Sequence, residues 1–245
     1  MSFYSNTNAE ARPVGVDLNA VMRQVYLWLT AGLVVCAGTA YFMAATGRTL
    51  GLFSNPIISI VLLIAYFVAV FALYPVVMRS SPAVGAIFYL GVTALLGIML
   101  STIFLEYKLG TIAFAFGATA ATFGAMSVVG YTTKVDLSRF GSILMMAVFG
   151  LIIASIVNLL FAPGGPTGPL FWLINYAGVL IFTGLTAYDT QWIKKYSQQV
   201  AASGNPDMIQ RIAIIGAFHL FLDFVNLFLF ILRILGGGRG GYSRR

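Results

Sequence analysis

The chain has 245 residues, of which 60% are hydrophobic and only 9% are charged. This composition excludes an ordinary soluble globular protein. It predicts an all-α polytopic membrane protein, because a helix satisfies its backbone hydrogen bonds within one segment. The net charge of +7 does not indicate nucleic-acid binding, since the basic residues fall in short loops and in the C-terminal tail. We therefore expect a lipid bilayer as the surrounding partner and no nucleic acid.

Seven apolar runs are each long enough to cross a bilayer, for which about 20 residues suffice. They cover residues 24–45, 56–78, 83–105, 110–131, 140–162, 170–191 and 211–235. We expect a polar N-terminal segment at 1–23, a single seven-helix transmembrane domain at 24–235, and a flexible basic tail at 236–245. Pro56 and Pro82 stand where a helix can begin.

Two connections between the runs are predicted from composition. The stretch APGGPTGP at 162–169 cannot continue a helix and predicts a turn. The polar stretch 194–210 is the longest predicted connection and is expected to end the sixth span.

Small residues recur at every fourth position in several runs, which is typical of close packing between membrane helices. They are Gly32, Cys36, Ala40 and Ala44 in the first run, Thr93, Gly97 and Ser101 in the third, and Ala113, Gly117, Ala121 and Ala125 in the fourth. We expect these ridges to lie at helix–helix contacts.

The distribution of basic residues predicts the orientation, because cytoplasmic loops carry an excess of lysine and arginine. One side would hold Arg12, Arg23, Arg79, Lys134, Arg139, Lys194, Lys195 and Arg211, and the other only Arg48 and Lys108. We expect a cytoplasmic N-terminus. The basic tail would then lie on the opposite side, against the rule.

The last apolar run carries a stripe of polar side chains. His219, Asp223, Asn226 and Arg233 are spaced by four, three and seven residues, so in a helix they share one face. A charge at the centre of a membrane helix costs about 2.5–3.5 kcal/mol even on insertion scales. The stripe must therefore face protein or water, and the last helix is expected inside a bundle.

A second carboxylate, Asp189, ends the sixth run. Asn175 and Thr186 share its helix face. Arg79 closes the second run on the same predicted side as Asp189. Two acids and one arginine could therefore converge.

Three segments resemble the Bax inhibitor-1 family. They are GLTAYDTQ at 184–191, LDFVNLFL at 222–229, and GYTTKVDL at 130–137, the last in the form that bacterial members carry. The resemblance implies a fold in which six helices wrap around a central seventh. It also implies a pH-sensitive cation path, chiefly a slow calcium leak, governed by two aspartates that match Asp189 and Asp223.

The resemblance further assigns a latch arginine to the second helix, which matches Arg79. Some members pair an acid on that helix with the arginine matching Arg233, but Ile57 to Met78 contains no acid. On physical grounds, two carboxylates in a low-dielectric site cannot both ionise easily and titrate as a unit. The hypothesis is a latch: ionised aspartates hold Arg79, and protonation favours the open state.

Calcium contacts at Asp189 and Asp223 would be weak, because a tight site takes six to eight oxygens. We expect no cofactor, with Ca²⁺ as transported ion. His219 either tunes the titration of the pair or bonds a neighbour. Asn226 either bonds another helix or lines a water-filled path.

Paired membrane aspartates also occur in intramembrane aspartyl proteases, but Leu222-Asp223-Phe224 lacks the glycines that those enzymes place before the acid. A retinal pigment is excluded because the last run has no lysine. We therefore expect no enzyme. Two hypotheses remain. The first is a pH-sensitive calcium or cation leak channel. The alternative, also drawn from the resemblance, is a regulatory protein that restrains a membrane-anchored ATP-dependent protease. In either case the expected location is a bacterial inner membrane.

Overall fold

The helices account for nearly all of the chain that the computed structural model describes, which is residues 18–161, 168–201 and 205–237. They are α1 (Leu18–Ala45), α2 (Arg48–Phe53), α3 (Pro56–Arg79), α4 (Pro82–Leu100), α5 (Ile103–Glu106), α6 (Leu109–Thr132), α7 (Ser138–Phe161), α8 (Pro169–Ala201) and α9 (Pro206–Gly237). Seven stretches, with α4 and α5 forming one of them, are long and apolar enough to span a membrane. This confirms the predicted all-α, seven-span architecture.

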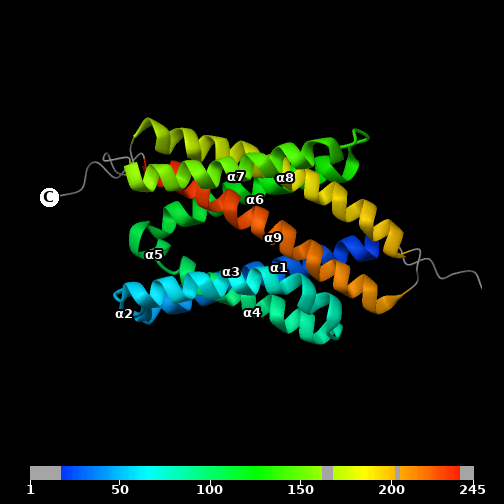
Figure 1. The fold of residues 1–245 in the computed structure, drawn as a ribbon, viewed down its shortest axis with the longest axis horizontal. Coiled ribbons are helices and arrows are strands. Elements are labelled where there is room, and N and C mark those ends of the chain that lie inside the picture. Colours follow the sequence, from blue (N-terminus) through cyan, green and yellow to red (C-terminus); the bar gives the residue numbers. More distant parts are fainter. Residues whose placement is uncertain (1–17, 162–167, 202–204, 238–245) are drawn as a thin grey trace, which may run out of the picture.

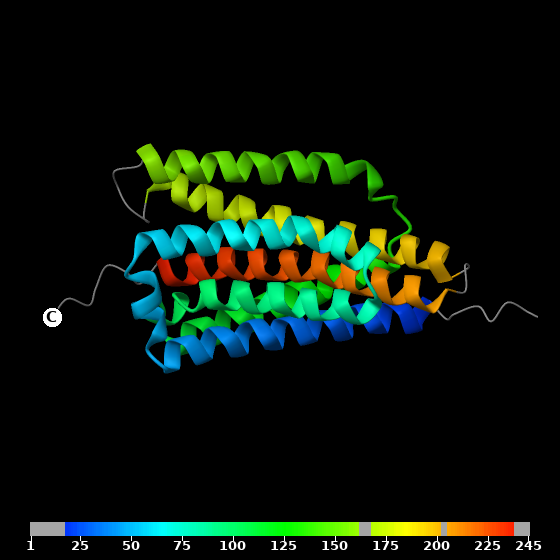
Figure 2. The same ribbon diagram turned by 60° about the horizontal axis from the view of Figure 1, so that its bottom comes forward.

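The last helix, α9, runs through the middle of the bundle (Figure 1, Figure 2). In its most apolar window 72% of the residues are buried, against at most 39% in any other span. It packs against α1, α3, α4, α6 and α8. The central position predicted for the last helix is confirmed, with one refinement: α7 packs mainly against α8 and lies at the edge of the bundle (Figure 2).

The two predicted proline starts are confirmed. Pro56 follows Asn55, whose side chain accepts a hydrogen bond from the backbone N–H of Ile57 at 3.0 Å. Pro82 follows Ser81, whose hydroxyl accepts from Val84 N–H at 3.4 Å. These caps satisfy N–H groups that a helix start leaves free, and proline loses nothing at that position.

Several predicted boundaries are wrong. The stretch 194–210 is mostly helical, because α8 continues to Ala201 and α9 begins at Pro206. Ile193 and Ser197 are buried one turn apart, so α8 becomes amphipathic here rather than ending. The bounds of the third run, 83–105, are confirmed by the span Pro82–Glu106, although the helix breaks inside it between α4 and α5, where the Ser101 hydroxyl donates to the carbonyl of Ile98 at 2.6 Å.

Other predictions fall wholly or partly outside the described residues. These are most of the N-terminal segment, most of the 162–169 turn and most of the basic tail. Within the described part, α1 begins at Leu18 and α9 continues to Gly237.

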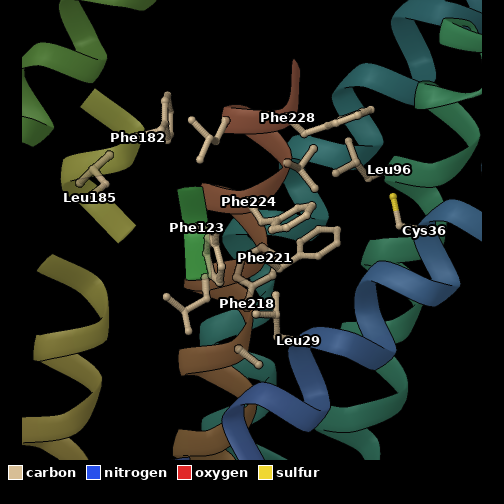
Figure 3. Packing of buried hydrophobic residues seen from close by; sticks show 14 of the residues in the cluster. Leu29, Cys36, Leu96, Phe123, Phe182, Leu185, Phe218, Phe221, Phe224 and Phe228 are labelled. Atoms are coloured by element: carbon tan, nitrogen blue, oxygen red, sulfur yellow. The ribbon is translucent and has the colours of Figure 1, made fainter. Parts of the chain in front are cut away.

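Aromatic side chains of α9 form the centre of the core (Figure 3). Phe218, Phe221, Phe224 and Phe228 are all buried on α9. They belong to one buried cluster with side chains from the surrounding helices, including Leu29 and Cys36 of α1, Leu96 of α4, Phe123 of α6, and Phe182 and Leu185 of α8. The fold therefore surrounds α9 on most sides.

Close approaches between helices use small residues in only some of the predicted places. A Cβ on Gly97 of α4 would meet the backbone of Cys36 on α1, so these two ridges do pack as expected. The ridge predicted on α6 is wrong: Ala113, Gly117, Ala121 and Ala125 are all exposed. Instead α6 touches α8 at Gly130, where a Cβ would meet the backbone of Ala187.

Candidate functional site

The two aspartates lie on neighbouring antiparallel helices, α8 and α9. The register of these helices is fixed where Phe230 packs against Gly178 and Ile193 packs against Gly216. Between these two contacts, Asp189 of α8 is level with His219 of α9, and Asp223 lies one turn further along. The candidate site is therefore inside the bundle, away from both ends of α9.

The carboxyl groups of Asp189 and Asp223 lie close enough to act directly on each other. Asp223 is 5% exposed, and the side chain of Asp189 is 14% exposed. Two carboxyl groups this close in a buried site titrate as a unit. The second oxygen of Asp223, Oδ2, is buried without a hydrogen-bond partner. The predicted convergence of the two acids is thus present in the structure.

His219 lies between the aspartates and the surroundings of the bundle. Its Nδ1 is 3.8 Å from Asp189 Oδ2, and its side chain is 43% exposed. The imidazole stacks on Trp192, with ring centroids 5.4 Å apart, and Trp192 stacks in turn on Tyr196 at 5.3 Å. His219 is thus held beside the pair, where a change in its charge would act directly on Asp189.

The third predicted member, Arg79, does not reach the aspartates. It is exposed at the last residue of α3, and the described residues include no carboxylate oxygen within ion-pair distance of it. A different arginine links the end of α3 to α9: Arg211 donates from its guanidinium to the carbonyl oxygen of Met78. The latch role of Arg79 stays a prediction.

The remaining predicted residues divide between those near the pair and those far from it. Thr186 is buried one turn before Asp189 and donates to the carbonyl of Phe182 at 2.8 Å. Asn226 lies three residues after Asp223 and donates to Leu222 at 2.9 Å. Asn175 is 14 residues before Asp189, about 21 Å along the helix, so the structure does not bring it to the site.

The oxygen atoms at the pair are few for a calcium site. Among the described residues no group of three or more His, Cys, Asp or Glu side chains is arranged to hold a metal ion. Calcium takes six to eight oxygens, so two carboxylates, Thr186 and water would supply only weak contacts. The predicted contacts of Asp189 and Asp223 with calcium stay a prediction.

The segment after Asp189 holds the α6–α7 connection in place. Gln191 uses both ends of its amide: it donates to the carbonyl of Val135 and accepts from the N–H of Leu137, each at 2.8 Å. Lys194 donates to the Tyr131 carbonyl at 2.7 Å. The two motifs at 130–137 and 184–191 are therefore one structural unit.

An ion pair extends the same unit outward. Lys195 Nζ lies 2.5 Å from Asp136 Oδ1. This hydrogen bond, together with those from Ser138, holds the pKa of the Asp136 carboxyl below its ordinary value. On sequence alone, Lys194 and Lys195 count as topology charges, and Gln191 has no assigned role. The signal in the sequence for this contact is that the motifs at 130–137 and 184–191 both occur in the chain.

Arg233, at the far end of the polar stripe, lies near an aromatic ring of α9 and near residues at the end of α5. Its guanidinium lies over the ring of Phe230, 5.4 Å from the centroid. Glu106, at the end of α5, and Tyr107 act on it electrostatically. The nearest acid therefore comes from α5, not from α3, and it is not within ion-pair distance.

Together the fold and the site define a multi-pass helical membrane protein with a buried carboxyl pair on its two C-terminal helices. Its sequence matches the family described as Inhibitor of apoptosis-promoting Bax1 over residues 18–240. The chain belongs to this family, the Bax inhibitor-1 family, as the three motifs predicted.

Full-length bacterial relatives support the assignment. The chain is 41% identical to the inner membrane protein YbhL of Escherichia coli K12 over 223 residues, covering 91% of this chain and 93% of the relative. It is 39% identical to an uncharacterized protein of Borreliella burgdorferi, covering 90% and 93%. A protein of Deinococcus radiodurans is 38% identical, covering 89% and 90%.

Proposed function

We propose that this protein is a pH-sensitive leak channel for calcium or other cations, gated at the Asp189–Asp223 pair. The observation that carries the proposal is the pair itself: two neighbouring carboxyl groups lie inside a membrane bundle, and Asp223 Oδ2 is buried without a hydrogen-bond partner. Ionisable groups at this depth are costly and typically belong to ion or proton pathways.

The pair can sense pH because its charge changes one proton at a time. In the proposed cycle the ionised pair favours the closed bundle, and protonation of the pair removes the charge that stabilises the closed state. His219 belongs to the same site, because its Nδ1 lies 3.8 Å from Asp189 Oδ2. Thr186, level with Asp223, and Asn226, one turn beyond it on α9, supply further polar atoms along the path.

The moving element in this proposal is α3. In its most apolar window only 11% of the residues are buried. Leu73 and Val77 are its buried side chains, both near the end that Arg211 holds through Met78. A helix attached to the central α9 mainly at one end can swing away from it. Arg79, which follows Met78, is the arginine that the family resemblance assigns to the latch.

The same proposal includes a location and an orientation. The E. coli relative is named an inner membrane protein, and we propose the same membrane for this chain. The excess of basic residues at the α6–α7 and α8–α9 ends supports a cytoplasmic N-terminus. In this proposal the protein is not an enzyme and needs no cofactor.

Reconstitution of the purified protein into vesicles that contain a calcium dye tests the function. We expect calcium entry without any partner protein, faster at mildly acidic than at mildly alkaline pH. Asp207→Asn is a matched control, because Asp207 is an exposed acid at the first turn of α9, far from the pair. Protein-free and protein-containing vesicles that leak equally at every pH would contradict the proposal.

A further inference from the structure

A cleft between α3 and α7 exposes part of the polar stripe of α9. It has a volume of about 530 Å³. Its walls are apolar and include Tyr66 and Phe67 of α3 and Leu151 and Ile152 of α7, while α9 contributes Asn226 and Arg233. Ile152 and Phe67 are about half exposed, at 49% and 51%, so the cleft is open at its side. In a bilayer this side faces lipid.

The charge in this cleft is unbalanced. Arg233 is the basic residue that lines it, and no carboxylate oxygen of the described residues lies within ion-pair distance of the guanidinium. Glu106 acts on Arg233 only from a distance. A guanidinium has five N–H donors, so Arg233 can bind another anion while Glu106 still acts on it from a distance. A cation on an apolar, lipid-facing wall calls for an anionic group that comes with the lipid.

The position of Arg233 fits a headgroup. It lies four residues before Gly237, the last residue of α9, which is about 6 Å along the axis. From Arg233 to Leu222 the cleft follows α9 for 11 residues, about 16 Å toward the middle of the bundle. The charged end is thus near the end of the span, and the apolar part runs inward, as in a phospholipid.

The length and lining of the cleft fit an acyl chain. It follows α9 for about 16 Å between apolar side chains of α3 and α7.

We propose that the α3–α7 cleft is a binding site for an anionic phospholipid. Its phosphate binds Arg233, and one acyl chain lies between Phe67 and Ile152. This proposal does not depend on ion conduction, because it concerns the end of α9 beyond the aspartate pair. A lipid in this place would also fill the space beside α3.

Native mass spectrometry of the purified protein, titrated with phosphatidylglycerol or phosphatidylcholine, tests the site. We expect preferential retention of phosphatidylglycerol. Arg233→Gln should weaken its binding about fivefold, the change expected for one basic residue facing an anionic lipid. Arg233→Lys should retain most of it. Arg48→Gln is the matched control, because Arg48 is exposed over Phe42 at the start of α2, and α2 lies at the end of the bundle where α9 ends (Figure 1).

A second variant tests the acyl-chain half of the site without touching Arg233. Ile152→Trp fills the open side of the cleft and should lower phosphatidylglycerol binding, even if Arg233→Gln does not fold. The proposal is overturned if Arg233→Gln binds phosphatidylglycerol as the wild type does, or if both lipids bind equally well. It is also overturned if Ile152→Trp leaves binding unchanged, which would indicate an ordinary surface contact or a water-filled cleft.

Discussion

Replacing Arg211 by methionine should increase the leak, because it removes the hydrogen bond that ties α9 to the end of α3. Arg211 reaches the Met78 carbonyl across 133 positions of sequence. Few other contacts hold α3 on the central helix, since most of its packing is against α4. If α3 moves away when the channel opens, this bond exists only in the closed state.

The magnitude follows from the kind of hydrogen bond. A bond from a charged donor contributes about 1.5–3 kcal/mol. Arg211 Nε is buried without a hydrogen-bond partner, which costs free energy in the closed state. Removing the side chain also removes this cost, so the net loss is at the lower end of the range. A loss of about 1.4 kcal/mol from the closed state raises the ratio of open to closed molecules about tenfold.

The assay is the initial rate of calcium entry into dye-filled vesicles at fixed pH and equal protein content. We expect Arg211→Met to leak about tenfold faster than the wild type, as the 1.4 kcal/mol estimate requires. Arg79→Met should have a smaller effect, because Arg79 is exposed and makes no ion pair with the described residues. An unchanged rate in Arg211→Met, or a rise confined to Arg79→Met, would refute the reasoning.

Three further predictions concern the junction of α6, α7 and α8. Gln191→Ala should lower the free energy of unfolding by about 1–3 kcal/mol, because two hydrogen bonds are lost; unfolding in graded denaturing detergent measures this, and an unchanged midpoint would contradict it. Because Lys195 holds the pKa of Asp136 below its ordinary value near ~4, their contact is intact above that value and is lost as the pH falls toward the lowered pKa. The protection of the α6–α7 loop amides against hydrogen exchange, relative to their intrinsic rates, should therefore fall in acid, and it should be low at every pH in Asp136→Asn. Gly130→Val should cost about 1–3 kcal/mol through overpacking against α8, whereas Gly117→Ala, with no atom within 4 Å of its Cβ position, should be tolerated.

The broad architecture could be predicted because hydropathy is a direct consequence of the bilayer. Each span appears as an apolar run, and the acid of the last run, Asp223, required shelter, which placed α9 in the centre. The meeting of Asp189 and Asp223 was also predictable, because consecutive elements of a chain are usually neighbours in space.

Details that depend on helix rotation were not predictable in the same way. Both faces of α6 are apolar, so spacing alone could not tell that Gly130, and not Gly117, faces α8. Arg79 and Arg211 are basic residues at the same end of the bundle, and only the direction of each side chain separates the exposed one from the one that binds Met78. The polar stretch after Asp189 predicts a loop, because a helix that leaves the apolar layer has the same sequence pattern as a helix that ends.

The central claim is that the buried aspartate pair sets the pH response. The most direct test is the pH profile of calcium entry for the wild type, Asp189→Asn and Asp223→Asn in the same vesicles. Asparagine keeps the shape of the side chain but cannot change its charge. The account predicts a rate that depends on pH in the wild type and that loses this dependence in Asp223→Asn. A profile that is unaltered in both variants would contradict it.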